Sequence, residues 1–290
     1  MYNIYICIPV FNRINYTISC LKSIENQTYK KYKVIIYDDL STDGTPEILE
    51  ANFPYVKLLK GTGNLWWTGG INECIKEVLR TAKKNDYVFT LNNDTELLPD
   101  TLQKLIKFSL ENPNTITGAV NILYTNPLTI EPSAFSFSSK RIFLKKLHFK
   151  VNQFGESIIN KNGVLKVNTL SGKGVLYPVE IFNNIGLFNF EKLPHYHADT
   201  EFVLRAGNNG YKVFLNYDAK VLSHHELTGS GTNLTKQNFI NFIRSFFTLK
   251  SVNHIPSLYN FTKLVYKKSF LFYFCAYVLM SIGGYIKRKF

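Results

Sequence analysis

The chain has 290 residues, 45% of them hydrophobic and 15% aromatic, which is enough to bury one large domain or two small ones and excludes disorder over most of its length. Its formal charge of +13 is typical of a nucleic-acid-binding protein, but positions 236–290 hold nine Lys or Arg and no Asp or Glu, so most of the excess lies in the C-terminal tail. The four cysteines are far apart and form no C-x-x-C pair, so the sequence indicates neither a disulfide framework nor a zinc knuckle, and a reducing compartment fits best.

The first 125 residues predict alternating strands and helices. Short β-rich runs predict strands at residues 4–9, 34–37, 56–59, 87–91 and 116–123. Apolar residues at helical spacing predict helices at residues 14–25, 46–52, 71–83 and 101–111. This order predicts an α/β fold, with a mostly parallel sheet and helices on both faces. Because ligands of such sheets bind beyond the carboxyl ends of the strands, the polar residues after each strand are the candidate site.

The second half of the chain is less regular. Residues 126–167 predict a substrate-facing insertion. Helices at residues 179–184 and 200–207, followed by strands at residues 212–215 and 219–223, complete the globular part. At the other end, the chain enters its first apolar strand without the basic segment and cleavage site of a signal peptide, so we expect a cytoplasmic protein.

Carboxylates and amides, rather than a glycine-rich loop, follow the predicted strands. The sequence has neither G-x-G-x-x-G after the first strand nor G-x-x-x-x-G-K-[ST], which argues against a dehydrogenase and a P-loop kinase. Instead Asp38 and Asp39 follow the second strand, and Asn92, Asn93 and Asp94 follow the fourth. Such groups accept hydrogen bonds from a base or a ribose and hold a divalent cation against a diphosphate. The simpler alternative is that both strings form turns, the first capping the next helix.

Four motifs in order resemble the family 2 glycosyltransferases with the GT-A fold, over roughly residues 3–245. They are IPVFNR at residues 8–13, IYDDLSTDGT at 36–45, LNND at 91–94 and HADTEFVLR at 197–205. The segment NLWWTGGIN at residues 64–72 resembles the N-x-G-F-x-G-G-x-N segment of the rhamnosyltransferase-like branch. The resemblance implies a Rossmann-like GT-A domain over residues 1–235, followed by a basic, apolar helical tail over residues 236–290 that associates with membranes.

The resemblance also implies a nucleotide pocket and a metal site. Pro9, Asn12 and Asp39 would line the pocket, with the Asp39 carboxylate facing the base. The LNND segment stands where the family carries an Asp-x-Asp metal motif, and only Asp94 keeps a carboxylate. We expect Asp94 to bind Mn²⁺ or Mg²⁺, with amides in outer positions and the diphosphate supplying much of the affinity. Asn93 is one of these amides and is also a candidate for binding the nucleotide sugar.

Asp199 matches the position of the family's catalytic base. The alternative is that it caps the helix that follows. Ala198 stands where most relatives carry Glu, so no neighbouring acidic residue gives reason to expect a raised pKa for Asp199. His224, and less so His225, follows the last core strand and would reach the metal or the diphosphate, unless it is simply a solvated loop histidine. His195 and His197 would line the pocket near Asp199, with no assigned chemistry.

The segment at residues 64–72 supplies further binding candidates. Trp67 would offer an indole face to a sugar ring, although tryptophans are commonly core residues. Gly69 and Gly70 would let backbone N–H groups approach an anion, and Asn72 ends the matching segment. Further along the chain, Lys173 is a weaker candidate for a phosphate contact, whereas Arg205 should pair with a carboxylate on its own helix.

The tail has three alternative interpretations. An apolar run at residues 269–286 has basic residues on both sides, Lys267 and Lys268 before it and residues 287–289 after it. The run barely reaches the length of a membrane span, and Gly283 and Gly284 weaken that interpretation. We favour a peripheral anchor on anionic lipid at the inner face of the cytoplasmic membrane, with a single-pass helix second and a nucleic-acid arm last.

Together these features predict an inverting, metal-dependent hexosyltransferase. It would transfer a sugar from a nucleotide diphosphate donor, dTDP-rhamnose or a UDP-sugar, to a hydroxyl of a saccharide acceptor. A surface anchor suits a lipid-linked acceptor of surface polysaccharide synthesis, such as O-antigen or capsule. One alternative is a catalytically silent protein of the same fold that binds nucleotide sugars or glycans. The other is a nucleotidyltransferase, whose glycine-rich first loop is absent after Val10.

Overall fold

The structure is a computed structural model that describes residues 2–124, 129–131, 134–137, 149–151, 161–224 and 238–289. The first half comprises β1 (Ile4–Val10), α1 (Ile14–Glu25), β2 (Tyr32–Asp38), α2 (Thr45–Asn52), β3 (Val56–Lys60), α3 (Trp66–Thr81), β4 (Tyr87–Thr90), β5 (Thr95–Leu97), α4 (Thr101–Glu111) and β6 (Thr115–Leu123). The second half comprises β7 (Thr129–Ile130), β8 (Ala134–Phe137), β9 (Phe149–Val151), β10 (Val164–Lys166), β11 (Thr169–Leu170), β12 (Val175–Pro178), α5 (Glu180–Ile185), α6 (Ala198–Asn208) and β13 (Lys212–Ser223). The tail contains α7 (Phe239–Ser245), α8 (Ile255–Tyr266), a 3₁₀ turn (Lys267–Ser269) and α9 (Phe270–Lys289).

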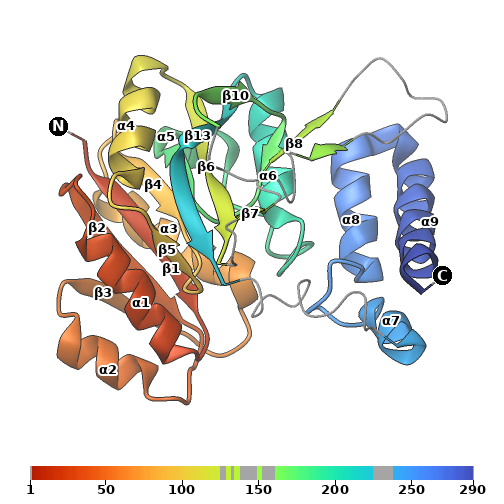
Figure 1. The fold of residues 1–290 in the computed structure, drawn as a ribbon, viewed down its shortest axis with the longest axis horizontal. Coiled ribbons are helices and arrows are strands. Elements are labelled where there is room, and N and C mark those ends of the chain that lie inside the picture. Colours follow the sequence, from red (N-terminus) through yellow and green to blue (C-terminus); the bar gives the residue numbers. More distant parts are fainter. Residues whose placement is uncertain are drawn as a thin grey trace.

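A mixed, mostly parallel sheet forms the centre of the molecule (Figure 1). Its strands lie in the order β10-β13-β6-β12-β4-β1-β2-β3, with β5 paired to β13 and β7 to β6. Strand β1 is parallel to both β2 and β4, and β6 is parallel to β13, whereas β12 is antiparallel to its two neighbours. The carboxyl ends of β1, β2, β4 and β6 therefore share one edge, as the βα alternation predicts.

Helices cover both faces of this sheet because its strands alternate between them. In β1, Ile4, Ile6 and Ile8 belong to the core formed with α1, α2 and α4. Tyr5 and Cys7 belong to the opposite core, formed with α3, α5 and α6. Successive side chains of a strand point to opposite faces, so a strand buried on both sides reads as a continuous apolar run. The α/β architecture predicted from the sequence is confirmed.

Most predicted elements lie where expected, and the differences are local. α1 and α4 have the predicted bounds, but α3 begins at Trp66 rather than at Ile71. The two strands predicted at residues 212–215 and 219–223 are one strand, β13, whose register shifts between Asn216 and Lys220. The predicted insertion at residues 126–167 falls largely outside the described residues. All four cysteines are free.

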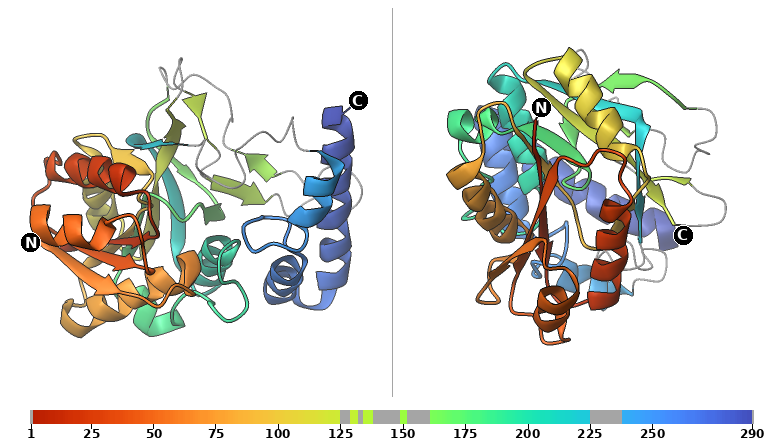
Figure 2. Two further views of the ribbon diagram at one scale, coloured as in Figure 1. Left: turned by 90° about the horizontal axis from the view of Figure 1, so that it is seen from below. Right: turned by 90° about the vertical axis from the view of Figure 1, so that its left-hand side faces the viewer.

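The tail packs back onto the globular part of the chain. Helix α8 contacts α6, and α9 returns along the outer side of α8 (Figures 1 and 2). Ring contacts join α8 to the first half of α9, including the stacked rings of Tyr266 and Tyr273 at 3.7 Å and the contact of Tyr259 with Phe270 at 5.4 Å. By length and composition, the helical stretch Ile255–Lys289 could cross a membrane.

Candidate active site

Two loops at the carboxyl edge of the sheet are bonded to each other. Asn12 has a left-handed backbone with φ of 57°, its N–H donates to Ser41 Oγ at 2.6 Å, and its Oδ1 accepts from Thr42 N at 2.8 Å. Asp43 accepts from Ile14 N at 2.9 Å and from Thr45 Oγ1 at 2.6 Å, at the starts of α1 and α2. The Asp-rich string therefore forms the turn that the simpler alternative predicted, and this turn also holds Asn12.

The Asp39 carboxylate fixes the loop that leads into α3. It accepts from the backbone N–H groups of Gly63, Leu65 and Trp66 at 2.9, 3.0 and 3.1 Å. Its neighbour Asp38 accepts from Ser41 N at 3.0 Å through Oδ2, while its buried Oδ1 has no hydrogen-bond partner in the described part of the chain. Asp39 thus has a structural role, and its contact with a nucleotide base stays a prediction.

The two glycines at the start of α3 permit close packing. A Cβ atom on Gly70 would lie 2.9 Å from Pro9 Cβ, and one on Gly69 would lie 2.7 Å from Leu65 Cβ. Only a residue without Cβ lets the helix approach β1 this closely. The N–H of Gly69 donates to Leu65 O and that of Thr68 to Pro194 O, so both donors already have acceptors. The predicted role of Gly69 and Gly70 in approaching an anion, like that of Pro9 in the pocket, stays a prediction.

Asn72 joins α3 to a distant segment. Its buried side chain donates to Phe188 O at 2.8 Å and accepts from Phe188 N at 3.1 Å. Its place in a sugar pocket stays a prediction, because both polar ends are used within the protein.

We expect Asn72→Ala to lower the free energy of unfolding by about 2–3 kcal/mol, because it leaves two buried backbone groups of Phe188 unpaired. Urea unfolding measures this change. The matched control is Asn209→Ala. It removes an exposed side chain whose amide bonds only to Arg205 O among the described contacts, and it should change the value by less than about 1 kcal/mol. Equal effects of the two substitutions would contradict the structural role of Asn72.

Trp67 connects the LNND segment to the candidate base. Its Nε1 donates to Asn92 Oδ1 at 2.8 Å. The indole also lies against Gly172, where a Cβ atom would be 2.6 Å from Trp67 Cζ2 and 3.2 Å from Asp199 Cβ. A glycine at position 172 therefore allows the side chains of both Trp67 and Asp199 to pack against the backbone at this point. Trp66 instead packs against the ring of His195 at 5.4 Å.

Asp199 lies in the first turn of α6, half-buried, and its carboxylate is held by two backbone donors. Oδ2 accepts from Gly172 N and Oδ1 from Thr200 N, both at 2.7 Å. The helix begins at Ala198 with His197 as its N-cap, so Asp199 is not the cap residue that the alternative predicted. Burial raises the pKa of Asp199 above its usual range, and the two N–H bonds oppose this only in part. The raised pKa therefore comes from desolvation, which the sequence gave no reason to expect.

Asp94 is buried, with one carboxylate oxygen unsatisfied. Its Oδ2 is 3.5 Å from Arg13 Nη1, whereas Oδ1 has no hydrogen-bond partner among the residues described. Burial raises the pKa of Asp94, and the positive charges of Lys173 and Arg13 oppose this rise. The adjacent Asn93 points elsewhere, because its Nδ2 donates to Thr17 Oγ1 at 3.0 Å and so supports α1.

A buried ion pair beside this carboxylate was not predicted. Lys173 Nζ lies 2.7 Å from Glu131 Oε2 and donates to Ser223 Oγ at 2.7 Å. Lys173 was a candidate for a phosphate contact, and here its ammonium is held by protein groups close to Asp94. Glu131 falls in the irregular segment at residues 126–167, where no periodicity or motif distinguished it.

His224 is next to Asp94 through its backbone, but its ring is engaged elsewhere. Its N–H donates to Asp94 O at 3.0 Å, while ring Nε2 is 3.0 Å from Glu96 Oε1. The ring also lies 5.1 Å from that of Tyr16 and 5.0 Å from that of Tyr124. Metal binding by His224 stays a prediction, and His225 lies outside the described residues.

The residues at this edge fit a cation that arrives with the substrate. Within the described ranges, no group of three His, Cys, Asp or Glu side chains could hold a metal ion by itself. The unsatisfied Oδ1 of Asp94 is nevertheless a suitable oxygen ligand for Mn²⁺ or Mg²⁺, ions that take their remaining ligands from phosphate and water.

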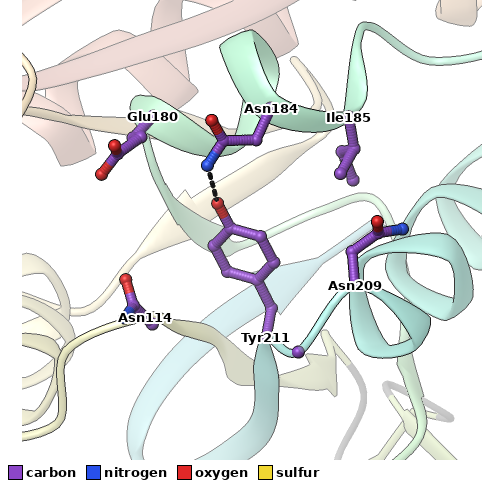
Figure 3. A pocket seen from close by; sticks show the side chains of 7 residues that line it. Asn114, Glu180, Asn184, Ile185, Asn209 and Tyr211 are labelled. Carbon is purple, nitrogen blue, oxygen red and sulfur yellow. Dashed lines mark hydrogen bonds between the residues drawn. The ribbon is translucent and has the colours of Figure 1, made fainter.

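A polar hollow of about 360 Å³ lies away from these residues (Figure 3). Asn114 and Tyr211, two of its lining residues, directly precede β6 and β13, so the hollow is at the amino ends of these strands. In it Asn184 Nδ2 donates to Tyr211 Oη at 2.8 Å. None of the predicted site residues lines this hollow, so it is not the candidate active site.

Comparison with known proteins identifies relatives of this chain. The profile of "Glycosyl transferase family 2" matches residues 5–186. An N-acetylglucosaminyl-diphospho-decaprenol L-rhamnosyltransferase of Mycobacterium tuberculosis is 26% identical over 227 residues, which are 73% of this chain and 72% of the relative. A GalNAc(5)-diNAcBac-PP-undecaprenol beta-1,3-glucosyltransferase of Campylobacter jejuni is 25% identical over 229 residues, 73% of this chain and 71% of the relative. A poly(ribitol-phosphate) beta-glucosyltransferase of Bacillus spizizenii is 32% identical over 119 residues, but these are 39% of this chain and only 18% of the relative.

Solved structures share the fold. The crystal structure of GalNAc-T7 with UDP, GalNAc and Mn²⁺ superposes with a TM-score of 0.69 at 14% identity, over 97% of this chain and 51% of that one. The structure of S. aureus TarS residues 1–349 superposes with a TM-score of 0.58 at 16% identity, over 96% of this chain and 88% of that one. The predicted GT-A fold, and the resemblance to family 2 and its rhamnosyltransferase-like branch, are confirmed.

Proposed function

We propose that this chain, which belongs to glycosyl transferase family 2, transfers a sugar from a nucleotide diphosphate donor to a hydroxyl of a saccharide acceptor with inversion at the anomeric carbon. The observation that carries the proposal is the placement of Asp199. Its carboxylate is held by Gly172 N beside the indole of Trp67, which in turn bonds to Asn92 of the LNND segment. In this proposal Asp199 is the base, Trp67 offers an aromatic surface to a sugar ring, and the LNND segment supplies the carboxylate for a metal ion.

The reaction needs one base and one displacement. The acceptor oxygen attacks the anomeric carbon as Asp199 takes its proton, and the bond to the diphosphate oxygen breaks. The N–H groups of Gly172 and Thr200 orient the carboxylate before substrate arrives. Asp94 Oδ1 would hold a Mn²⁺ or Mg²⁺ ion, which when bound supplies positive charge for the leaving diphosphate. Arg13, whose side chain is 43% exposed beside Asp94, is placed to add further positive charge.

The relatives suggest the substrate class but leave the donor open. One is named a rhamnosyltransferase and the other a glucosyltransferase, at nearly the same identity to this chain. The names therefore do not choose between the dTDP-rhamnose and UDP-sugar donors expected from the sequence. Both names contain a polyprenol-linked saccharide as acceptor. We accordingly propose a lipid-linked acceptor in surface polysaccharide synthesis, such as that of O-antigen or capsule.

The tail would hold the enzyme on the inner face of the cytoplasmic membrane. The tail exposes large apolar side chains, including Phe239, Ile240, Phe247, Phe272 and Leu279. Since the tail holds nine basic and no acidic residues, anionic lipid is the complementary partner. Contacts of α9 with the rest of the tail, from Phe270 on Tyr259 to Tyr285 on Phe242, favour a helix that lies on the surface over one that spans the bilayer alone.

We expect the full chain to bind vesicles of equal parts phosphatidylglycerol and phosphatidylcholine. Replacing Phe272 and Leu279 together by Asp should weaken binding at least about tenfold, because each buried apolar side chain contributes roughly 1.5–3 kcal/mol. Co-sedimentation measures the bound fraction. Leu165→Asp, at a 44% exposed leucine outside the tail, is the control and should bind as the wild type does. Release of the protein from membranes by alkaline carbonate would support a tail that lies on the membrane surface. Retention would support a single membrane-spanning helix.

Turnover of a panel of nucleotide sugars, with and without Mn²⁺ or Mg²⁺, tests the proposed function. Metal-dependent release of the nucleotide from one donor, increased by a polyprenol-linked saccharide, would support it. Donor binding without transfer to any acceptor would favour the silent binding protein. Release of pyrophosphate from a nucleoside triphosphate and a sugar phosphate would favour a nucleotidyltransferase.

A further inference from the structure

His197 connects the tail to the first turn of α6. It caps the helix two residues before Asp199, with a left-handed backbone of φ 71°. Its ring Nε2 is 2.9 Å from the Val252 carbonyl oxygen in the segment before α8. Burial lowers the pKa of His197 and so favours the neutral ring. Since a carbonyl only accepts, the single ring N–H lies on Nε2 and donates to Val252.

The same imidazole packs on the tail through its face. The ring of Phe261 in α8 stacks on it, with centroids 5.0 Å apart and planes 26° from parallel. Phe261 also forms a buried cluster with Leu193 and with Ala198, the residue between His197 and Asp199. The tail therefore contacts this turn through both the edge and the face of one histidine.

Helix α9 supports both of these contacts from behind. Tyr277 of α9 lies 6.3 Å from the Phe261 ring, edge to face. Ser281 Oγ, also in α9, donates to Asn253 Oδ1 at 2.9 Å, next to Val252. Both contacts of α9 are therefore made next to a partner of His197: Tyr277 contacts Phe261, and Ser281 contacts the neighbour of Val252. A non-glycine residue is uncommon in the left-handed region, where it persists only when its surroundings hold it.

We infer that His197 is a positioning residue for Asp199, and that the tail is the support that keeps it in place. The inference rests on the proposed role of Asp199 as base. The tail then belongs to the catalytic unit in addition to any role as an anchor: losing its contacts with His197 would let the first turn of α6 relax and free the Asp199 carboxylate from Gly172 N.

Hydrogen exchange tests this without any substrate. In His197→Ala, exchange of the Gly172 N–H, which donates to Asp199, should accelerate at least about tenfold. Exchange of the Gly63 N–H, which donates to Asp39, should not change. Phe261→Leu, which leaves residue 197 intact, should accelerate Gly172 in the same direction. Unchanged exchange at Gly172 in both variants would overturn the inference, whether or not the chain proves to be a glycosyltransferase.

Kinetics give a second readout. With a donor and an acceptor that the wild type uses, His197→Ala should lower kcat about 10- to 100-fold while the donor Kd stays within about twofold. His197→Gln keeps an N–H donor for Val252 and should recover part of the lost kcat. The control is Asn209→Ala at the far end of α6, whose exposed side chain bonds to Arg205 O and which should keep wild-type kcat. An equal loss in the Asn209 variant, or no recovery with Gln, would overturn the positioning role.

Discussion

Asp199→Asn is expected to lower kcat for sugar transfer about a thousandfold while leaving the donor Kd within about twofold. The amide has the shape of the carboxylate and its oxygen can still accept from Gly172 N, but it cannot take the proton of the acceptor hydroxyl. The loss should therefore be confined to the chemical step. Steady-state kinetics and donor titration measure the two quantities separately.

The pH profile provides an independent check of the same base. Burial raises the pKa of Asp199 above its ordinary value of 3.8, and only the ionised carboxylate can act as base. Wild-type kcat should therefore fall as the pH drops, with the acid limb centred above pH 3.8, whereas the residual rate of the Asn variant should lack this limb. Asp100→Asn, at a half-exposed carboxylate paired with Lys104, is the control and should keep the wild-type profile. A thousandfold loss would be contradicted by an Asn variant that retains more than about a tenth of the rate.

Local periodicity predicted the elements whose stability is local. Helix α4 ends where predicted because its buried residues, among them Leu102, Leu105 and Ile106, recur at helical spacing over its length. Arg205 pairs with Glu201 at 2.9 Å, as predicted, because residues four apart are neighbours on a helix. Such features need no knowledge of the rest of the chain.

Elements fixed by distant contacts were predicted less well. Helix α3 begins five residues early at Trp66, a start stabilised by the Asp39 carboxylate, which lies 27 residues away. The short strand β12 was not predicted, because it exists by inserting antiparallel between β4 and β6. The Glu131–Lys173 ion pair joins residues 42 apart. No window of local sequence contains these partners.

The motifs predicted which residue types stand at the edge of the sheet, but not the hydrogen bonds that each side chain makes. Asn72 and Asn93 were both candidates for binding the nucleotide sugar, yet their amides bond to Phe188 and to Thr17 within the protein. A motif indicates which residue type stands at a position. The hydrogen-bond partners of that residue depend on which distant segments the fold brings next to it. The same holds for the pKa of Asp199. The sequence offered no neighbouring acidic residue to raise it, whereas in the structure burial raises it.

Asp94→Asn is expected to abolish metal-dependent turnover, with kcat/KM for the donor at least about a hundredfold lower in Mn²⁺. Asp94 is the only carboxylate of the LNND segment, and its Oδ1 lacks a partner among the described residues. An amide in its place is a neutral and weaker ligand for a hard cation. Adding Mn²⁺ together with a donor should raise the Tm of the wild type and leave that of the variant unchanged. Glu96→Gln, two residues along the chain at the partner of His224, is the control and should lower turnover by less than about fivefold.

The same substitution should not destabilise the metal-free protein at neutral pH. Because burial raises the pKa of Asp94 above 3.8, ionising this carboxylate is less favourable in the folded chain than in the unfolded one. This cost in folding free energy is absent at pH values below the pKa of the unfolded chain. It is complete at pH values above the pKa of the folded chain, so the wild type loses stability from this group as the pH rises. Asn carries no such cost, and the Tm of the variant relative to the wild type should increase from pH 4 to pH 7. A variant that loses both turnover and metal-free stability at pH 7 would instead place Asp94 in the structural framework, with Arg13 as the partner it needs.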